Sequence, residues 1–182
     1  LLELLKRPFL IIGQQANISA SIGLAVLHHE TQSVDDLTKH AELALYEAKN
    51  NARGHYIFFE SSFEKKALEQ HDLEVSLRRA LLLQELTLFY QPQVNMSDNK
   101  VVGFEALIRW ERPGKGMISP TSFIPLAEST GEIHEIGKWV LQTACREAMS
   151  WPEHITIAVN VSPVQFENNQ LVSTVKAALA SS

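Results

Sequence analysis

Apolar and polar residues alternate from Val101 to Trp110, and a period of two predicts a β-strand whose two faces differ. One face is wholly apolar and should pack into a core, whereas the other carries Glu105 and Arg109 among apolar neighbours. A buried carboxylate is costly unless a cation, water or a metal ion is its partner. The apolar face comprises Val102, Phe104, Ala106, Ile108 and Trp110.

Glu105 and Arg109 lie four residues apart, which corresponds to roughly 13 Å along an extended strand. This separation is too long for a direct ion pair, and it suits one elongated ligand that contacts both side chains. The competing interpretation is a solvated strand face with Arg109 at its rim, and it is open at this point.

The residues around this strand predict a hairpin followed by alternating helices and strands. Leu86–Val94 is a second apolar strand, and the polar segment Asn95–Lys100 predicts an antiparallel turn. The alternation after the hairpin predicts a parallel β/α barrel, which needs roughly 250 residues, so the barrel does not close within this chain. The further elements are a helix from Ser119-Pro120 to Gly131 that Pro125 either breaks or restarts, a helix over Glu132–Trp151, a strand over Ile155–Val161 and a helix from Pro163.

The residues before Ser61 predict a separate, smaller set of helices and strands. Ser61–Leu83 is then a continuous, charge-rich helical pattern, and we interpret its first part as a spacer between two domains. Both chain ends lie inside helical patterns, so we expect a fragment of a longer polypeptide. The early elements are a helix end at Leu1–Arg7, a hairpin of Phe9–Ile12 and Ile18–Leu27 with its turn at residues 13–17, a helix over Val34–Asn50 capped by Ser33 or Asp35, and a strand over Tyr56–Phe59.

The composition favours one or two small globular domains without a strongly basic nucleic-acid surface, since 45% of the residues are hydrophobic and the net charge is −5. The single cysteine, Cys145, fits a reducing compartment and is by default a core thiol. No apolar run approaches the length needed to span a membrane. We expect a cytoplasmic location, as a whole protein or as the cytoplasmic part of a membrane-anchored one.

Two histidines and a carboxylate at His28-His29-Glu30 are residue types that occur in metal sites. Neighbouring residues of a strand, however, point to opposite faces. A solvated loop is therefore the favoured interpretation of this segment.

Glu105-Ala106-Leu107 with Arg109 two residues later resembles the signature of EAL domains, the cyclic di-GMP phosphodiesterases. Further blocks follow in the family's order. The resemblance implies the first part of a TIM-type β/α barrel with its active site at the C-terminal strand ends. The other blocks are Leu88–Val94, Ile118–Pro120 with Phe123–Glu128, Ile136–Leu141, and Val159–Ser162 with Gln165-Phe166.

The same resemblance implies a metal-dependent site for a nucleotide. Glu105 and Asn160 match the family's metal ligands, and their oxygen donors suit Mg²⁺ or Mn²⁺. From its position alone, Asn160 is a turn residue after a strand. For Leu107 and Pro120, core packing is the competing interpretation. The implied nucleotide contacts are Arg109 at a phosphate, Gln91 and Gln165, and Leu107 and Pro120 at a base.

The N-terminal half resembles the C-terminal part of a GGDEF domain, the diguanylate cyclase fold. We therefore predict an α/β chain with a GGDEF-like piece at 1–60, a linker helix at 61–72 and the N-terminal part of an EAL-like barrel at 73–182. Lys49 and Arg53 would contact phosphates in such a domain, and a solvated helix end is an equal alternative. The matching residues are Pro8-Phe9, Ser21–Gly23, Ala41–Lys49, Arg53 and Tyr56.

The leading functional hypothesis is that the longer protein hydrolyses cyclic di-GMP to linear pGpG with the help of a metal ion, whereas this chain alone is inactive. Two alternatives are open, namely a catalytically silent cyclic di-GMP receptor and a diguanylate cyclase whose EAL half is regulatory. Cyclic di-GMP is the expected partner, and no nucleic-acid polymer is expected. A homodimer through the EAL-like domain is compatible with the resemblance.

Overall fold

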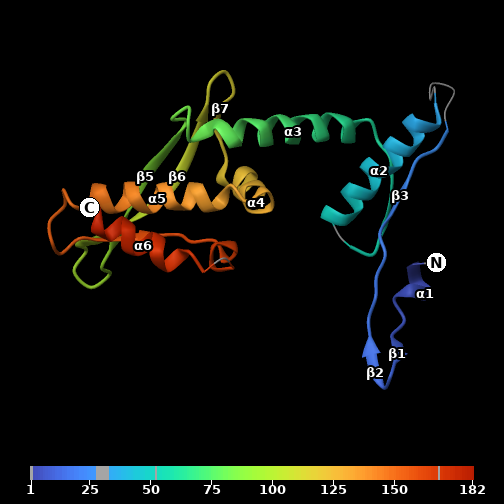
Figure 1. Ribbon diagram of the computed structural model, residues 1–182, viewed down its shortest axis with the longest axis horizontal. Helices are drawn as coiled ribbons and strands as arrows, with labels where there is room; N and C mark the ends of the chain where they lie inside the picture. The colour runs from blue at the N-terminus through green and yellow to red at the C-terminus, as the bar shows by residue number, and fades with distance from the viewer. Residues whose placement is uncertain (1, 28–32, 52, 168) are drawn as a thin grey trace. The chain divides into compact units, whose positions relative to one another are not determined.

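Figure 1 shows the computed structural model of the chain, which describes residues 2–27, 33–51, 53–167 and 169–182. The chain divides into two compact units, residues 1–71 and residues 72–182. Each unit has its own helices and strands. The segment His28-His29-Glu30 lies outside the described residues.

The first unit begins with α1 (Leu2–Leu5) and a hairpin of β1 (Phe9–Ile11) and β2 (Gln14–Ala16). The hairpin predicted between Phe9–Ile12 and Ile18–Leu27 is therefore wrong. Ile12 and Gly13 have φ values of 50° and 76°, and two successive residues in this region make a tight two-residue turn. The chain consequently reverses at once, and Gln14–Ala16 becomes the partner strand instead of the turn.

The remaining strands of the first unit form a β-α-β arrangement. β3 (Ile22–Leu24) pairs in parallel with β4 (Tyr56–Phe58), and α2 (Val34–Asn51) connects them. Ser33 caps α2, because its Oγ accepts the Asp36 backbone N–H at 3.1 Å. A parallel pair needs such a crossover, which explains why the two short strands lie far apart in the sequence.

The helix predicted over Ser61–Leu83 is confirmed as α3 (Ser62–Ala80). It is continuous across the boundary between the two units. Leu77 and Ala80 in its last turns are 2% and 0% exposed and belong to the core of the second unit. The exact limits of the predicted linker, residues 61–72, stay a prediction.

The second unit contains an open sheet of four strands whose centre is β6 (Val101–Arg112). β5 (Leu86–Val94) pairs antiparallel with one edge of β6. The other edge pairs with β8 (Thr156–Val159) in parallel and with β7 (Gly116–Ile118) antiparallel. The predicted hairpin of β5 and β6 is confirmed. β7 is an additional strand that the sequence analysis did not predict. Within the described residues the sheet does not close into a barrel, as predicted.

Helices α4 (Pro120–Thr130) and α5 (Ile133–Ala148) follow β7, and α5 lies along the sheet in Figure 1. Pro125 lies inside α4 without ending it, and Gly131 ends the helix in a left-handed conformation with φ 83°. α5 ends before Trp151, which lies outside the helix and packs against the rings of Tyr90 and Phe104 instead. A short 3-10 helix, η1 (Pro163–Phe166), and α6 (Leu171–Ala180) complete the unit.

The apolar face of β6 packs into the core through its C-terminal half, where the alternation predicts buried residues. Trp110 is fully buried, its ring meets Phe123 edge-on at 5.5 Å, and its Nε1–H donates to Glu85 Oε2 at 2.9 Å. Val102, near the start of the strand, is 42% exposed. The buried cluster comprises Leu77, Ala80, Leu86, Trp110, Phe123, Leu126, Ala127, Ile133, Ile136 and Val140.

Replacing Trp110 by Ala should lower the free energy of unfolding of the second unit by about 3–5 kcal/mol, because it opens a cavity at the centre of the cluster. Hydrogen exchange of α5 amides reports this unit alone and avoids the lost indole fluorescence. Met117→Ala is the matched control, since Met117 on β7 is 51% exposed. A loss for Trp110→Ala no greater than that for Met117→Ala would contradict this account of the core.

Candidate functional site

The register of the sheet brings Gln91 next to Glu105. Gln91 on β5 and Ala158 on β8 are the residues directly opposite Glu105 on its two sides. Directly opposed residues share a face of a sheet, so Gln91 and Glu105 lie on the same face. Glu105 is half-buried and Gln91 is exposed.

Asn160 reaches the same face from the end of β8. It follows Ala158 by two residues, and its Nδ2–H donates to Glu105 Oε1 at 2.6 Å. These two side chains are 55 residues apart in the sequence. No other hydrogen bond or ion pair involves either side chain within the described residues. With the amide in this orientation, Asn160 Oδ1 and Glu105 Oε2 are the two oxygen atoms left for another ligand.

The donor chemistry of Glu105 and Asn160 fits a hard divalent ion. A carboxylate oxygen and an amide carbonyl oxygen are ligands that Mg²⁺ and Mn²⁺ accept, with water completing the coordination shell. Among the described residues no three His, Cys, Asp or Glu side chains gather as a metal-binding group. Glu105 and Asn160 therefore offer two oxygen ligands, fewer than the coordination shell of a divalent ion takes.

Arg109 lies toward the end of β6, on the Glu105 face, opposite Thr87 of β5. Its guanidinium carbon lies 5.5 Å from the centre of the Phe89 ring, and Nη1–H donates to the Ile108 carbonyl at 2.8 Å. No carboxylate pairs with it within the described residues. A half-buried guanidinium without a carboxylate partner can pair with an anionic ligand.

A cavity of about 360 Å³ brings most of the predicted site residues together. It lies between the C-terminal half of β6, helices α4 and α5, and the connection from β8 to η1. Gln91 and Glu105 do not line it, although Asn160 links Glu105 to its wall. The predicted residues that line the cavity are Leu107, Arg109, Pro120, Asn160 and Gln165.

Gln165 is only 6% exposed, and its side chain stabilises the start of η1. Its Oε1 accepts the Ser162 backbone N–H at 3.0 Å, while Ser162 Oγ accepts the Val164 backbone N–H at 3.2 Å. This is a capping box, and it gives Gln165 a structural contact independent of any ligand. The spacing of Ser162 and Gln165, Ser-x-x-Gln, is a sequence signal for a capping box, and the sequence analysis did not use it.

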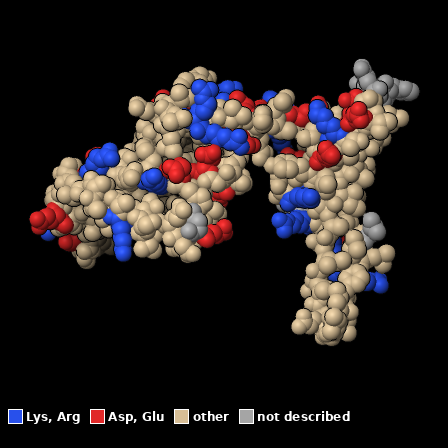
Figure 2. Space-filling view, in the orientation of Figure 1, with Lys and Arg blue, Asp and Glu red and all other residues tan. Residues whose placement is uncertain are grey.

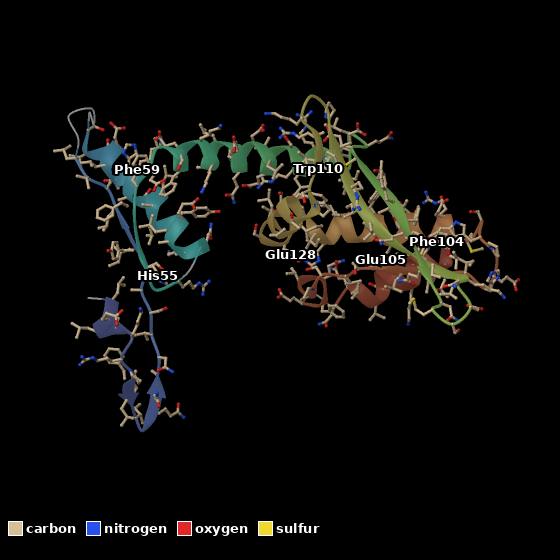
Figure 3. All side chains as sticks on the ribbon, turned by 180° about the vertical axis from the view of Figure 1, so that it is seen from behind. His55, Phe59, Phe104, Glu105, Trp110 and Glu128 are labelled. Atoms are coloured by element: carbon tan, nitrogen blue, oxygen red, sulfur yellow. The ribbon has the colours of Figure 1, made fainter. Side chains whose placement is uncertain are left out.

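Glu128 is a residue of this cavity to which the sequence analysis gave no role. It lies near the end of α4 (Figure 3). Its Oε1 accepts the Ser162 hydroxyl at 2.6 Å, across 34 residues of sequence. No local pattern could reveal this pair, because the contact depends on how α4 packs beside the β8–η1 connection.

Lys49 and Arg53 are exposed, Lys49 in the last turn of α2 and Arg53 after the helix. Their contact with phosphates stays a prediction. Cys145 is half-buried in α5, and burial raises the pKa of its thiol, which lowers the thiolate fraction at neutral pH. This agrees with its interpretation as a structural thiol.

Acidic and basic side chains are interspersed over the visible face of each unit, without a continuous basic surface (Figure 2). None of the helices in the described part of the chain is both long enough and apolar enough to cross a membrane.

Comparison with protein families assigns both halves of the chain. The EAL domain family matches residues 74–182, and the family described as "Diguanylate cyclase, GGDEF domain" matches residues 1–55. The chain therefore belongs to the EAL domain family, and it consists of a C-terminal part of a GGDEF domain followed by a partial EAL domain.

Individual relatives match nearly the whole chain. The bifunctional diguanylate cyclase/cyclic di-GMP phosphodiesterase MucR of Pseudomonas aeruginosa is 43% identical over 98% of this chain and 27% of its own length. An uncharacterized protein of Sinorhizobium fredii is 38% identical over 98% of the chain and 22% of its own length. A solved structure of the PaMucR phosphodiesterase in complex with c-di-GMP superposes with a TM-score of 0.58 and 45% identity, over 60% of this chain and 46% of that one. The chain thus spans about a quarter of the length of these two curated relatives.

Proposed function

We propose that the protein carrying this chain hydrolyses one phosphodiester bond of cyclic di-GMP and releases linear pGpG. The observation that supports this most directly is the 2.6 Å contact between Asn160 and Glu105, because it joins two oxygen-bearing side chains from separate strands. MucR, the relative that is 43% identical to this chain, is described as a cyclic di-GMP phosphodiesterase as well as a cyclase. The intact Glu105–Asn160 pair favours hydrolysis over silent binding of the nucleotide.

In this proposal Glu105 and Asn160 hold a divalent ion, Mg²⁺ or Mn²⁺, at the face of β6. When bound, the ion would neutralise phosphate charge and make a water molecule more acidic. Arg109 would hold a phosphate oxygen by charge-assisted hydrogen bonds. Its guanidinium would then either move away from the Phe89 ring or contact the ring and the phosphate together. Gln91, opposite Glu105, would contact the nucleotide on the same face.

The proposed base pocket is the cavity beside Arg109. Leu107 and Pro120 supply apolar lining there, which suits the face of a purine. Gln165 Oε1 already accepts the Ser162 N–H, so Gln165 would contact the nucleotide mainly through its Nε2 group. Its main contribution would be to hold the wall of the cavity. The partner is cyclic di-GMP, and self-association through the EAL domain and a cytoplasmic location are parts of the same proposal.

Replacing Glu105 by Ala in the full-length protein should abolish pGpG production, because it removes a carboxylate ligand of the ion while the opposite face of β6 keeps its packing. Chromatography of the nucleotides after incubation with Mg²⁺ or Mn²⁺ measures this. Glu111→Ala is the matched control, since Glu111 is an exposed carboxylate on the same strand. Wild-type pGpG production by a purified Glu105→Ala variant would exclude the proposed role.

Replacing Arg109 by Ala should weaken cyclic di-GMP binding by about one to two decades and leave Mn²⁺ affinity nearly unchanged. The loss corresponds to roughly 1.5–3 kcal/mol for a hydrogen bond to a charged group. Separate calorimetric titrations with cyclic di-GMP and Mn²⁺ test it, with Arg146→Ala, an exposed arginine of α5, as control. An equal loss in both titrations would make Arg109 a structural residue instead.

Residues 1–182 expressed alone should not hydrolyse cyclic di-GMP. Two oxygen ligands leave most of a divalent ion's coordination shell to water, so the ion should bind weakly and position its water poorly. The edges of β5 and β8 that face away from β6 also have no partner strand among the described residues, which favours association between chains. Turnover by a folded monomer, lost on Glu105→Ala, would overturn this expectation.

A further inference from the structure

Asn160 belongs to a short connection, residues 160–162, between β8 and η1. On one side the connection is held by the parallel pairing of β8 with β6, which ends at Val159 opposite Ala106. On the other side it is held at Ser162, the N-cap of η1. The direction in which Asn160 points therefore depends on the β8 ladder and on the contacts that fix Ser162.

Every polar group of Ser162 has a partner. Its backbone N–H donates to Gln165 Oε1, and its carbonyl accepts the Gln165 N–H at 3.0 Å. Its Oγ accepts the Val164 N–H, and its single hydroxyl proton goes to Glu128 Oε1 at 2.6 Å. A hydroxyl has one proton to donate. Because this proton points to Glu128, the lone pairs of the Ser162 oxygen point toward the Val164 N–H, which they accept.

The other member of the cap is held by close packing. Gln165 lies so near Gly137 of α5 that a Cβ on Gly137 would come within 2.1 Å of Gln165 Nε2. Helix α5 therefore limits where Gln165 can lie, and helix α4 fixes Ser162 through Glu128. The Asn160 connection is thus attached to two helices that lie outside the sheet.

We propose that Glu128 is a positioning residue for Asn160. Its carboxylate holds Ser162, and Ser162 in turn holds the Asn160 amide at the hydrogen-bonding distance from Glu105. Glu128 would have this effect on the Asn160–Glu105 contact whether or not an ion is bound. Its consequence for metal affinity rests on the proposed function, since it assumes that Asn160 Oδ1 is a ligand.

Glu128→Ala should release the Asn160 side-chain amide in the metal-free full-length protein. The amide is followed by ¹⁵N–¹H correlation spectroscopy and assigned by its disappearance in Asn160→Asp. We expect its two proton shifts to move toward those of a solvated asparagine and its exchange with water to accelerate several-fold. Mn²⁺ affinity, measured by electron paramagnetic resonance, should fall by about three- to tenfold, as for one lost hydrogen bond.

Conservative and matched variants separate positioning from general destabilisation. Glu128→Gln keeps an oxygen acceptor for the Ser162 hydroxyl, so its Asn160 signal and Mn²⁺ affinity should stay within about twofold of wild type. Ser162→Ala should have at least the effect of Glu128→Ala, because it also removes the acceptor of the Val164 N–H, and the double variant should be no worse than Ser162→Ala. Glu135→Ala, an exposed carboxylate on α5, should change nothing.

An unchanged Asn160 amide in folded Glu128→Ala would overturn the proposal, as would an equal effect of Glu128→Gln or additive effects of the two single variants. If Glu128→Ala does not fold, Ser162→Ala decides by the same amide signal. Absence of Mn²⁺ binding in the wild type would count against the proposed function alone, since the metal-free amide signal would still decide the role of Glu128.

Discussion

The pairing of β6 on both edges is the constraint on which the second unit depends. β5 pairs with one edge, and β7 and β8 share the other. Since side chains alternate with a period of two, a shift of β6 by one residue would move Trp110 out of the core and turn Glu105 into it. Such a shift would also change the register of all three ladders that β6 forms. One register therefore maintains the core and the candidate site together.

The second requirement is the abrupt change from strand to helix after β8. Asn160 points to Glu105 because the chain leaves the ladder at Val159 and is capped at Ser162 within a few residues. A longer connection would leave the amide free to sample other positions, at a cost in conformational entropy when it binds a ligand. The capping box and the hydroxyl contact with Glu128 hold the far end of this connection at Ser162.

Sequence patterns predicted the elements whose signals are local and strong. The alternation over Val101–Trp110, the capping residue Ser33 and the stop at Gly131 all have the predicted structure. Errors occurred where an apolar run could pair with more than one partner. Ile22–Leu24 is apolar enough to complete a hairpin with Phe9–Ile11, but it pairs with Tyr56–Phe58 across a helix. β7 has three residues, too few for a periodic signal to reveal it.

The sequence by itself determined the family, the two-faced strand and the identity of the candidate ligands, because motifs and periodicity are properties of neighbouring residues. Only the tertiary structure decided that Asn160 contacts Glu105, that Gln165 is buried in a cap, and that Glu128 holds Ser162. These contacts join residues from different elements. Their distances follow from strand register and helix packing, which depend on the free energy of the whole core rather than on any local pattern.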